Sequence, residues 1–463
     1  MVSEKFRYQL RQEIQQWESE GLIDRQIYEQ LVIRYRLEEL DSMARDRFVL
    51  IVIGLGFIII GLGLITLVAA NWQVWSRPIK VFILLSFFIV SNSAGFSLWQ
   101  SPKHSQAKLG QGLLLLGALS IGANIGLMSQ MFHQTGSSYL LYLVWSLAVL
   151  LMAYGLRLTS LGILAIILMA IAYGWGVINI LGWGREIFGQ ELQQMPLIVS
   201  SLFISLAYYC RSRWLFGLTI ILTSFALAIN LGQYANISDS IFQSFATASL
   251  AVLIPACFWT YRDNLLFPSI ELPHKFESFS RKFAIFYLCL VLYVGSFNAI
   301  WHSSNYPQNI DGSLENISFL IAPLIFSLFS IWAWWKSGQR SDENFPWRLE
   351  RDSAAIGLFL AIIGGLIGVN TYYSLHETGT IIFNLMLFCL GIGLIRQSVN
   401  MGQRLSFWSG ILLLSLQLLS RMFEYSTGLI FKAIVLFVCG LAIILAGLWF
   451  ERYLNNFTTT NNN

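Results

Sequence analysis

Charged residues are scarce in this sequence. Asp, Glu, Lys and Arg together make up 12% of its 463 residues, whereas hydrophobic residues make up 56%. A soluble globular protein of ordinary composition carries roughly 25% charged residues. This chain has too little polar surface to cover a water-soluble globule, so its composition favours an integral membrane protein.

Signatures of soluble enzymes and of metal sites are also missing from the sequence. No P-loop, HExxH or GxSxG motif occurs, and the paired glycines between Gly54 and Gly63 lie inside an apolar run, which excludes a dinucleotide-binding turn. The five cysteines are scattered through apolar runs without CxxC spacing, and His133, His302 and His376 lack the spacing of metal or haem ligands. We therefore expect no cofactor and no metal.

The first 47 residues are polar and predict a helical hairpin. Gly21 is a plausible C-cap for the first helix, and Asp24 can cap the second. The apolar residues at helical spacing are Phe6, Leu10, Ile14 and Trp17, followed by Ile27, Leu31, Val32 and Tyr35. This stripe either closes the hairpin on itself or docks it on the membrane domain, a second copy or a partner.

Apolar runs long enough to cross a bilayer, at about 20 residues each, fill most of the remaining chain. We predict an all-α polytopic bundle of 14 spans, give or take two, over residues 48–454, with the hairpin at 1–47 and a disordered tail at 455–463. The runs are 48–70, 79–99, 109–131, 138–156, 159–181, 195–210, 214–231, 241–260, 283–301, 316–335, 354–373, 379–395, 404–420 and 428–450.

The basic residues predict the orientation, because cytoplasmic loops retain Lys and Arg. When the spans are threaded alternately, nearly all of the 29 basic residues fall on the side of the N-terminus. The exceptions are Arg77, Lys80, Arg185, Arg421 and Lys432. Both termini are therefore expected in the cytoplasm.

Acidic residues are missing from the middle of every predicted span. A carboxylate at that depth is costly and usually marks an ion path or a proton relay, so its absence argues against a proton-driven pump. Lys432, about one turn into the last run, is the most embedded charge. It either reaches the outer interface or forms an outer ion pair with Glu424 across the preceding loop.

Amide side chains are the main polar groups that enter the predicted spans. Hydrogen bonding between helices is their ordinary role, and lining a polar cavity is the alternative. These amides are Asn92, Gln111, Asn124, Asn179, Asn230, Asn298, Asn370, Asn384 and Gln417.

The third run carries the most distinctive polar pattern. Small and polar residues share one helical face there, and the candidate polar cavity or stripe consists of Gln111, Asn124, Ser129, Gln130 and His133. A similar small-residue stripe occupies the eleventh run, from Gly357 to Thr371. Such stripes either allow close helix packing at the centre of a bundle or face a groove.

Three features of the N-terminal third of the chain, about residues 8–150, carry a resemblance to a known family. The hairpin turn Glu20-Gly21-Leu22-Ile23 and the end of the first span, Ala69-Ala70-Asn71-Trp72, carry part of the resemblance. The rest comes from the third span through Gly117, Gly122-Ala123, Gln130 and His133, and from Trp145 in the next span. With these features the segment resembles an uncharacterised bacterial membrane-protein family, domain of unknown function 2157. The resemblance implies a multi-pass protein of the bacterial plasma (inner) membrane and leaves the roles of Asn71, Trp72 and Trp145 open.

These patterns favour a non-enzymatic translocator, either a transporter or a flippase, for a small or amphipathic solute. The alternative is a membrane scaffold or assembly factor that docks partners, or a second copy, through residues 1–47. A membrane glycosyltransferase is disfavoured because the first outer loop, Asn71 to Pro78, contains no acid. Membrane lipid is the expected partner, and nucleic acid is not.

Overall fold

The described part of the chain is helical throughout. The computed structural model describes residues 4–35, 59, 75–133, 136–178, 193–237, 240–263, 275–301, 318–338, 350–370, 372–373, 375–425 and 428–460. Within these ranges every regular element is a helix and no strand occurs. The predicted all-α polytopic fold is therefore confirmed.

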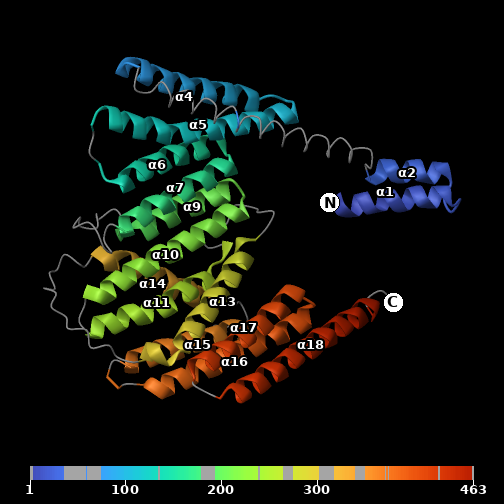
Figure 1. Cartoon of the computed structure of the whole chain (residues 1–463), viewed down its shortest axis with the longest axis vertical. Coiled ribbons are helices and arrows are strands. Elements are labelled where there is room, and N and C mark those ends of the chain that lie inside the picture. Colours follow the sequence, from blue (N-terminus) through green and yellow to red (C-terminus); the bar gives the residue numbers. More distant parts are fainter. Residues whose placement is uncertain are drawn as a thin grey trace. The chain divides into compact units, whose positions relative to one another are not determined.

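The chain forms two compact units, residues Met1–Ser137 and Ser138–Asn463. Figure 1 labels the helices. The first unit contains α1 (Glu4–Ser19), α2 (Arg25–Tyr35), α4 (Arg77–Trp99) and α5 (His104–Met131). The second contains α6 (Ser138–Leu156), α7 (Thr159–Ile178), α9 (Met195–Tyr209), α10 (Arg213–Ile237), α11 (Ser240–Thr260), α13 (Phe276–Gly295), the 3-10 helix η2 (Asn298–Trp301), α14 (Ser318–Gly338), α15 (Arg351–Asn370), α16 (His376–Met401), α17 (Arg404–Glu424) and α18 (Leu429–Thr460).

Twelve of these helices are long and apolar enough to cross a membrane. The first predicted span, 48–70, lies outside the described residues apart from Ile59, and every other predicted run coincides with a helix. Helix α9 is apolar but has only 15 residues. Helix α18 continues to Thr460, so residues 455–460 extend a helix where we predicted a disordered tail. Adding a residue to an existing helix avoids the cost of nucleation, which explains how a sequence of weak helix formers continues it.

Residues 4–35 form the predicted hairpin. Gly21 has a φ of 74°, and the N–H of Leu22 donates to the carbonyl of Trp17 at 2.9 Å, which is the bonding of a Schellman C-cap. Ile14 is fully buried at the centre of the hairpin. The side chains packed around it are Leu10, Trp17, Ile23, Tyr28, Leu31, Val32 and Tyr35. Ile27, which we predicted on this face, is 49% exposed. The apolar stripe thus closes the hairpin.

Glycines bring α4 and α5 into close contact. A Cβ placed on Gly110 would lie 2.3 Å from the backbone nitrogen of Trp99, and one placed on Gly117 would lie 2.5 Å from Nδ2 of Asn92. Gln111, Ser129 and His133 of the predicted stripe lie on a different face of α5 from these glycines, whereas Asn124 lies on the same face, at about 100° of rotation per residue. Close packing of α4 therefore uses Gly110 and Gly117.

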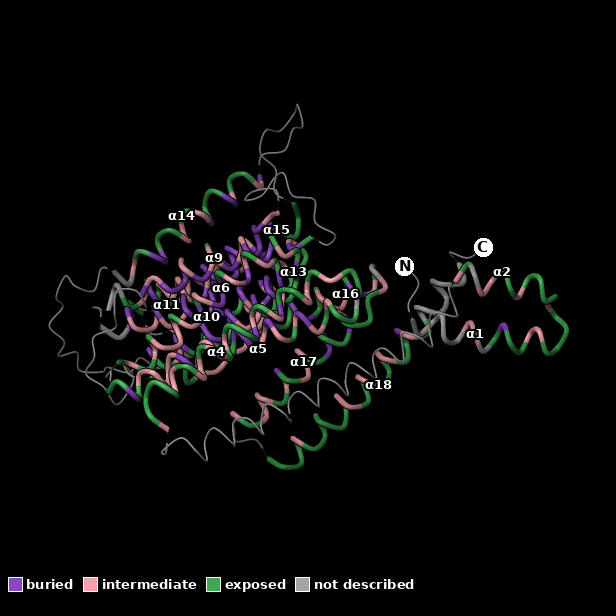
Figure 2. The backbone as a smooth tube through the Cα atoms, turned by 90° about the horizontal axis from the view of Figure 1, so that it is seen from above, coloured by how far each residue is buried: buried purple, intermediate pink, exposed green. Residues whose placement is uncertain are grey.

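Helix α10 is the most buried span of the second unit. In its apolar window 67% of the residues are buried, and it contacts α7, α9, α11, α13 and α14. Figure 2 shows buried segments gathered around α9 and α10, whereas α18 is mostly exposed. Helix α15, whose small-residue stripe suggested either close packing at a bundle centre or a groove, has 22% of its apolar window buried. An added Cβ would lie 3.3 Å from Trp334 at Gly357 and 3.5 Å from Val252 at Gly364, whereas Gly368 has no described neighbour within 4 Å.

Two turns of the second unit share a sequence pattern and a backbone conformation. Tyr154 precedes Arg157 (φ 53°) between α6 and α7, and Tyr208 precedes Arg211 (φ 51°) between α9 and α10. In each case the tyrosine hydroxyl donates a hydrogen bond to the next pair of helices along the chain. Tyr154 donates to a carbonyl of α9 at 2.6 Å, and Tyr208 donates to Asp263, between α11 and α13, at 2.5 Å. The two helical pairs are thus built and joined alike.

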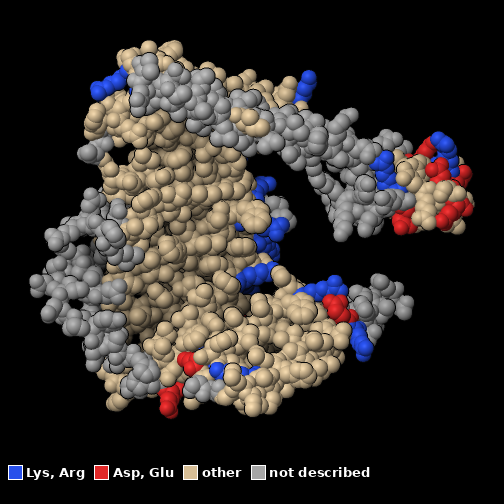
Figure 3. All heavy atoms as spheres, viewed as in Figure 1, with Lys and Arg blue, Asp and Glu red and all other residues tan. Residues whose placement is uncertain are grey.

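Charge is sparse along the helices of the second unit. Figure 3 shows, on the face in view, an almost continuous surface without charged side chains, with Lys and Arg mainly toward its edges. This distribution is what a bilayer-spanning bundle requires, because an ion in the hydrocarbon layer is costly.

Candidate functional site

The predicted stripe on α5 is extended along the helix. Asn124 is buried, and its Nδ2 donates to the carbonyl of Ser120, one turn earlier, at 2.7 Å. Gln111 and Ser129 are half-buried, whereas Gln130 and His133 at the end of the helix are exposed.

The amide oxygen of Asn124 is buried and has no hydrogen-bond partner among the described residues. The stripe therefore contains one buried acceptor without a described partner, Oδ1 of Asn124, and an exposed polar end at Gln130 and His133. Of the family-motif positions, Asn71 and Trp72 lie outside the described residues, and Trp145 stacks on Tyr142 with ring centroids 6.1 Å apart.

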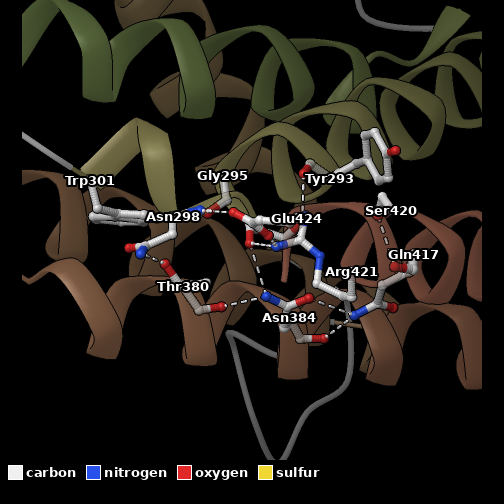
Figure 4. A network of polar contacts seen from close by, with 11 residues as sticks. Tyr293, Gly295, Asn298, Trp301, Thr380, Asn384, Gln417, Ser420, Arg421 and Glu424 are labelled. Carbon is white, nitrogen blue, oxygen red and sulfur yellow. Dashed lines mark hydrogen bonds and ion pairs between the residues drawn. The ribbon is translucent and has the colours of Figure 1, made fainter. Parts of the chain in front are cut away.

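A second polar cluster, which the sequence did not single out, joins α13, η2, α16 and α17. Figure 4 shows its side chains directed toward one another from these elements. We call it the α17 cluster and define it by Ser296, Asn298, Thr380, Asn384, Gln417, Arg421 and Glu424. Gln417, Arg421 and Glu424 are spaced i, i+4 and i+7 on α17 and therefore share one face of that helix.

A buried tryptophan fixes the end of α13 against α16. Helix α13 stops at Gly295, and η2 brings Trp301 back so that its indole N–H donates to the Gly295 carbonyl at 2.7 Å. Gly379 leaves room for this ring, because a Cβ placed there would lie 2.5 Å from it. Phe383 packs edge-on against Trp301 with centroids 5.1 Å apart. This packing holds the last carbonyls of α13, which have no partner within the helix, beside α16.

Two amides connect the three helices. Asn384 on α16 donates from Nδ2 to the carbonyl of Ser296 at 3.0 Å and to that of Thr380 at 2.8 Å. Gln417 on α17 donates from Nε2 to the backbone oxygen of Asn384 at 2.9 Å and to its Oδ1 at 3.1 Å. Both amide orientations are thereby fixed. The Oε1 atom of Gln417 is buried and has no partner among the described residues.

An ion pair lies at the end of α17. The Nη1 of Arg421 donates to the carbonyl of Ser296 at 2.5 Å and to Oε2 of Glu424, while Oε1 of Glu424 accepts the backbone N–H of Asn298 at 2.7 Å. Both side chains are mostly buried, with 16% and 17% of their surface exposed. The guanidinium lies over the ring of Phe297, 4.2 Å from its centroid. The cluster thus contains an oriented, largely desolvated charge pair.

The predicted pairing of Glu424 with Lys432 is wrong. Glu424 pairs with Arg421 on its own helix, three residues earlier, where helical geometry places the two side chains together. Lys432 belongs to the first turn of α18 and is half-buried, and it forms no ion pair with any described residue.

One edge of Arg421 is unused. Its Nε and Nη2 atoms are buried and have no hydrogen-bond partner among the described residues. These two nitrogens form the side edge of the guanidinium, whose parallel N–H groups match two oxygens of a carboxylate or phosphate. The cluster therefore presents a two-pronged donor and, one turn earlier on α17, a buried acceptor.

The opposite end of α13 holds a polar cluster whose described bonds explain it structurally. Asp263 accepts the N–H of Phe276 at 3.0 Å and the hydroxyl of Tyr208 at 2.5 Å, and thus caps the start of α13. Tyr261 lies 2.8 Å from the Tyr208 hydroxyl, and burial raises the pKa of Tyr261. This carboxylate is occupied in holding helices together.

Metal ligation finds no support in the described part of the chain, where no group of three His, Cys, Asp or Glu side chains lies close enough to hold an ion. Of the three histidines considered from the sequence, His133 is exposed. His302 and the side chain of His376 lie outside what the structure describes.

Sequence reasoning listed Asn384 and Gln417 only among amides that enter the membrane, and counted Arg421 only for orientation. The spacing of Gln417, Arg421 and Glu424 was a usable signal, because three polar residues on one face of a span predict a shared environment. The contributions of Ser296 and Asn298 come from another part of the chain and leave no such pattern.

Comparison with known proteins finds a family match for the N-terminal third of the chain. No curated protein and no solved structure matches the chain. The α17 cluster lies outside the one matched region, so its chemistry is read from this chain itself. Residues 15–162 match the model of the family described as predicted membrane protein (DUF2157), which confirms the resemblance predicted over residues 8–150.

Proposed function

We propose that this protein is a translocator, a transporter or flippase, of a small or amphipathic solute, and that the solute contacts the α17 cluster. The observation that carries the proposal is a mostly buried Arg421, with an unused donor edge, at the end of an apolar span. Ionisable residues inside membrane bundles are costly and mark substrate or ion pathways.

The hydrogen-bond pattern supports a ligand role for this cluster beyond packing. Amides that only join helices need partners for their polar atoms, because a buried unsatisfied group costs roughly 1–3 kcal/mol. Asn384 and one end of Gln417 meet this condition, whereas Oε1 of Gln417 and two nitrogens of Arg421 do not, among the described residues.

The scaffold alternative receives less support. Its docking element would be the hairpin, yet the apolar stripe of residues 4–35 packs around Ile14 inside the hairpin. A pull-down with the full chain and with a chain that begins near Ser42 tests this alternative. Recovery of the same proteins by both would remove it.

Reconstitution in liposomes tests translocation. Movement of NBD-labelled phosphatidylglycerol and phosphatidylethanolamine is followed by dithionite quenching, and release of trapped radiolabelled glycerol 3-phosphate tests a soluble solute. We expect at least one of these probes to cross faster than in protein-free liposomes. If none of the three probes crosses faster than in protein-free liposomes, the proposal is contradicted for these solute classes.

Two sets of substitutions locate the pathway. The variant N384L/Q417M keeps side-chain volume and removes both amides of the α17 cluster, and the matched variant changes Gln111, Asn124, Gln130 and His133 of α5 together. We expect the first variant to lose the activity and the second to retain it. The reverse result would move the pathway to α5.

A further inference from the structure

We infer that Arg421 and Gln417 bind a glycerol phosphate unit, with the phosphate on the arginine and a hydroxyl on the glutamine. The site is that of the proposed function, so this inference names the chemistry of its ligand. The ligand unit has two sources, the headgroup of phosphatidylglycerol or soluble glycerol 3-phosphate.

The arginine edge selects an oxyanion. Nε and Nη2 of Arg421 are both buried donors without a described partner, while Nη1 is held by Ser296 and Glu424. Two parallel N–H donors fit two terminal oxygens of one phosphate, and such charge-assisted pairs are stronger than neutral hydrogen bonds. Phe297 covers a face of the guanidinium and leaves this edge as the bonding direction.

Glu424 is the positioning residue of the site. Its Oε1 is bonded to the N–H of Asn298 and its Oε2 to Nη1 of Arg421, so both oxygens are occupied on the side away from the free edge. The pair holds the guanidinium in one orientation. Its negative charge also weakens attraction for an anion, which gives Glu424 a testable effect opposite to that of Arg421.

Gln417 adds the requirement for a hydroxyl. Its Nε2 is committed to Asn384, which leaves Oε1 as a buried acceptor that needs a donor. Residues four apart on a helix have Cβ atoms about 5–6 Å apart. A glycerol phosphate spans that distance with an anionic end and hydroxyl donors, whereas phosphatidylcholine offers the phosphate without a hydroxyl.

Binding is measured on the delipidated full chain in detergent by native mass spectrometry, with phosphatidylglycerol and phosphatidylcholine as probes. We expect a preference for phosphatidylglycerol of about tenfold, the scale of satisfying one buried polar group. Q417M should abolish the preference, because the hydroxyl that distinguishes the two lipids binds Gln417. R421Q should weaken binding of both lipids, since both carry the phosphate; R421K should restore part of that binding, and E424Q should retain or increase it. The exposed pair of Arg404 and Glu451 provides the matched control R404Q, which should change nothing.

Competition with glycerol 3-phosphate identifies the source. Displacement of phosphatidylglycerol assigns the site to the soluble solute, and its failure assigns the site to the lipid. Equal binding of the two lipids by the wild type, with no binding of glycerol 3-phosphate, would overturn the inference. So would a Q417M variant that keeps the preference, or an R421Q variant that binds both lipids as strongly as the wild type.

A photoreactive phosphatidylglycerol keeps the test independent of folding in the variants. Cross-links on the wild-type chain should fall in η2, in α17 around Arg421, or in the first turns of α16. Cross-links confined to other helices would also overturn the inference. Because binding is measured without transport, loss of binding with intact translocation rejects this inference alone, and binding without translocation rejects only the proposed function.

Discussion

Gly110 shows how much a single residue decides in the first unit. An added Cβ would meet backbone atoms of Trp99 and Gly95 at 2.3 and 2.7 Å, and backbone cannot move aside as a flexible side chain can. Gly112, two residues later on the same helix, has no described atom within 4 Å of an added Cβ. The two glycines provide a matched pair.

We predict that G110A lowers the free energy of unfolding by about 1–3 kcal/mol, because α4 and α5 must separate. G112A should be neutral or stabilising by up to about 1 kcal/mol, since alanine is the better helix former. Thermal unfolding of the purified protein followed by circular dichroism measures both. Equal effects of the two substitutions would contradict the close contact.

Asp263 is the second residue whose role is defined by its bonds. It accepts two backbone N–H groups at the start of α13, from Phe276 and Glu277, in addition to the Tyr208 hydroxyl. Loss of the carboxylate leaves these donors without their acceptor.

We predict that D263A destabilises the protein by about 1–2 kcal/mol, the range for the loss of a helix cap. Asp352, an exposed acid in the first turn of α15, supplies the control D352A, with an effect below about 1 kcal/mol from the helix dipole. Urea or thermal unfolding in detergent compares the two. A D263A variant as stable as D352A would show that Asp263 is not the cap.

At the scale of elements, the turns after α6 and α9 are alike in backbone but differ in what their arginines do. Arg157 and Arg211 both have positive φ, which costs a non-glycine residue about 1–2 kcal/mol. Both side chains are exposed, but the Arg157 guanidinium lies 4.0 Å from the centroid of the Tyr209 ring, whereas Arg211 forms no such contact with a described residue. The cation–π contact offsets the backbone cost in the first turn.

We predict that R211G stabilises the protein by about 0.5–1 kcal/mol, because glycine relieves the strain and loses some of the gain to its larger unfolded-state entropy. R157G should be close to neutral, since it also removes a cation–π contact of about 0.5–1 kcal/mol. Melting temperatures of the two variants are compared. A larger rise in melting temperature for R157G than for R211G would refute the role of the cation–π contact.

At the scale of the whole molecule, the distribution of basic residues predicts the topology. Lys103 lies between α4 and α5 on the predicted cytoplasmic side, and Tyr372, 71% exposed, lies between α15 and α16 on the predicted outer side. Each is the test position for one side of the membrane.

We predict that Y372C, in a chain without its five native cysteines, reacts with a membrane-impermeant maleimide on intact cells. K103C should react only after permeabilisation. Gel-shift labelling with maleimide-polyethylene glycol measures both. Labelling of K103C on intact cells would reverse the topology.

Local features of the fold could be predicted from the sequence, and contacts between distant segments could not. Gly21 and Ile14 act within one hairpin, so caps and periodicity predicted them correctly. A helical wheel of α5 identified a polar face, yet the face that contacts α4 is that of Gly110 and Gly117. The wheel contains no information about where a neighbouring helix lies. The pair of Arg421 and Glu424 is local, three residues apart on one helix, and the sequence alone could have identified it in place of the alternative pair of Glu424 and Lys432.

The sequence by itself determined that this chain is a membrane protein made of apolar helices, because hydropathy and helical hydrogen bonding act within each segment. Only the tertiary structure decided which polar side chains meet. Ser296, Asn384 and Arg421 are far apart in the chain and join in one cluster, since helix packing, not local preference, sets which faces are buried together.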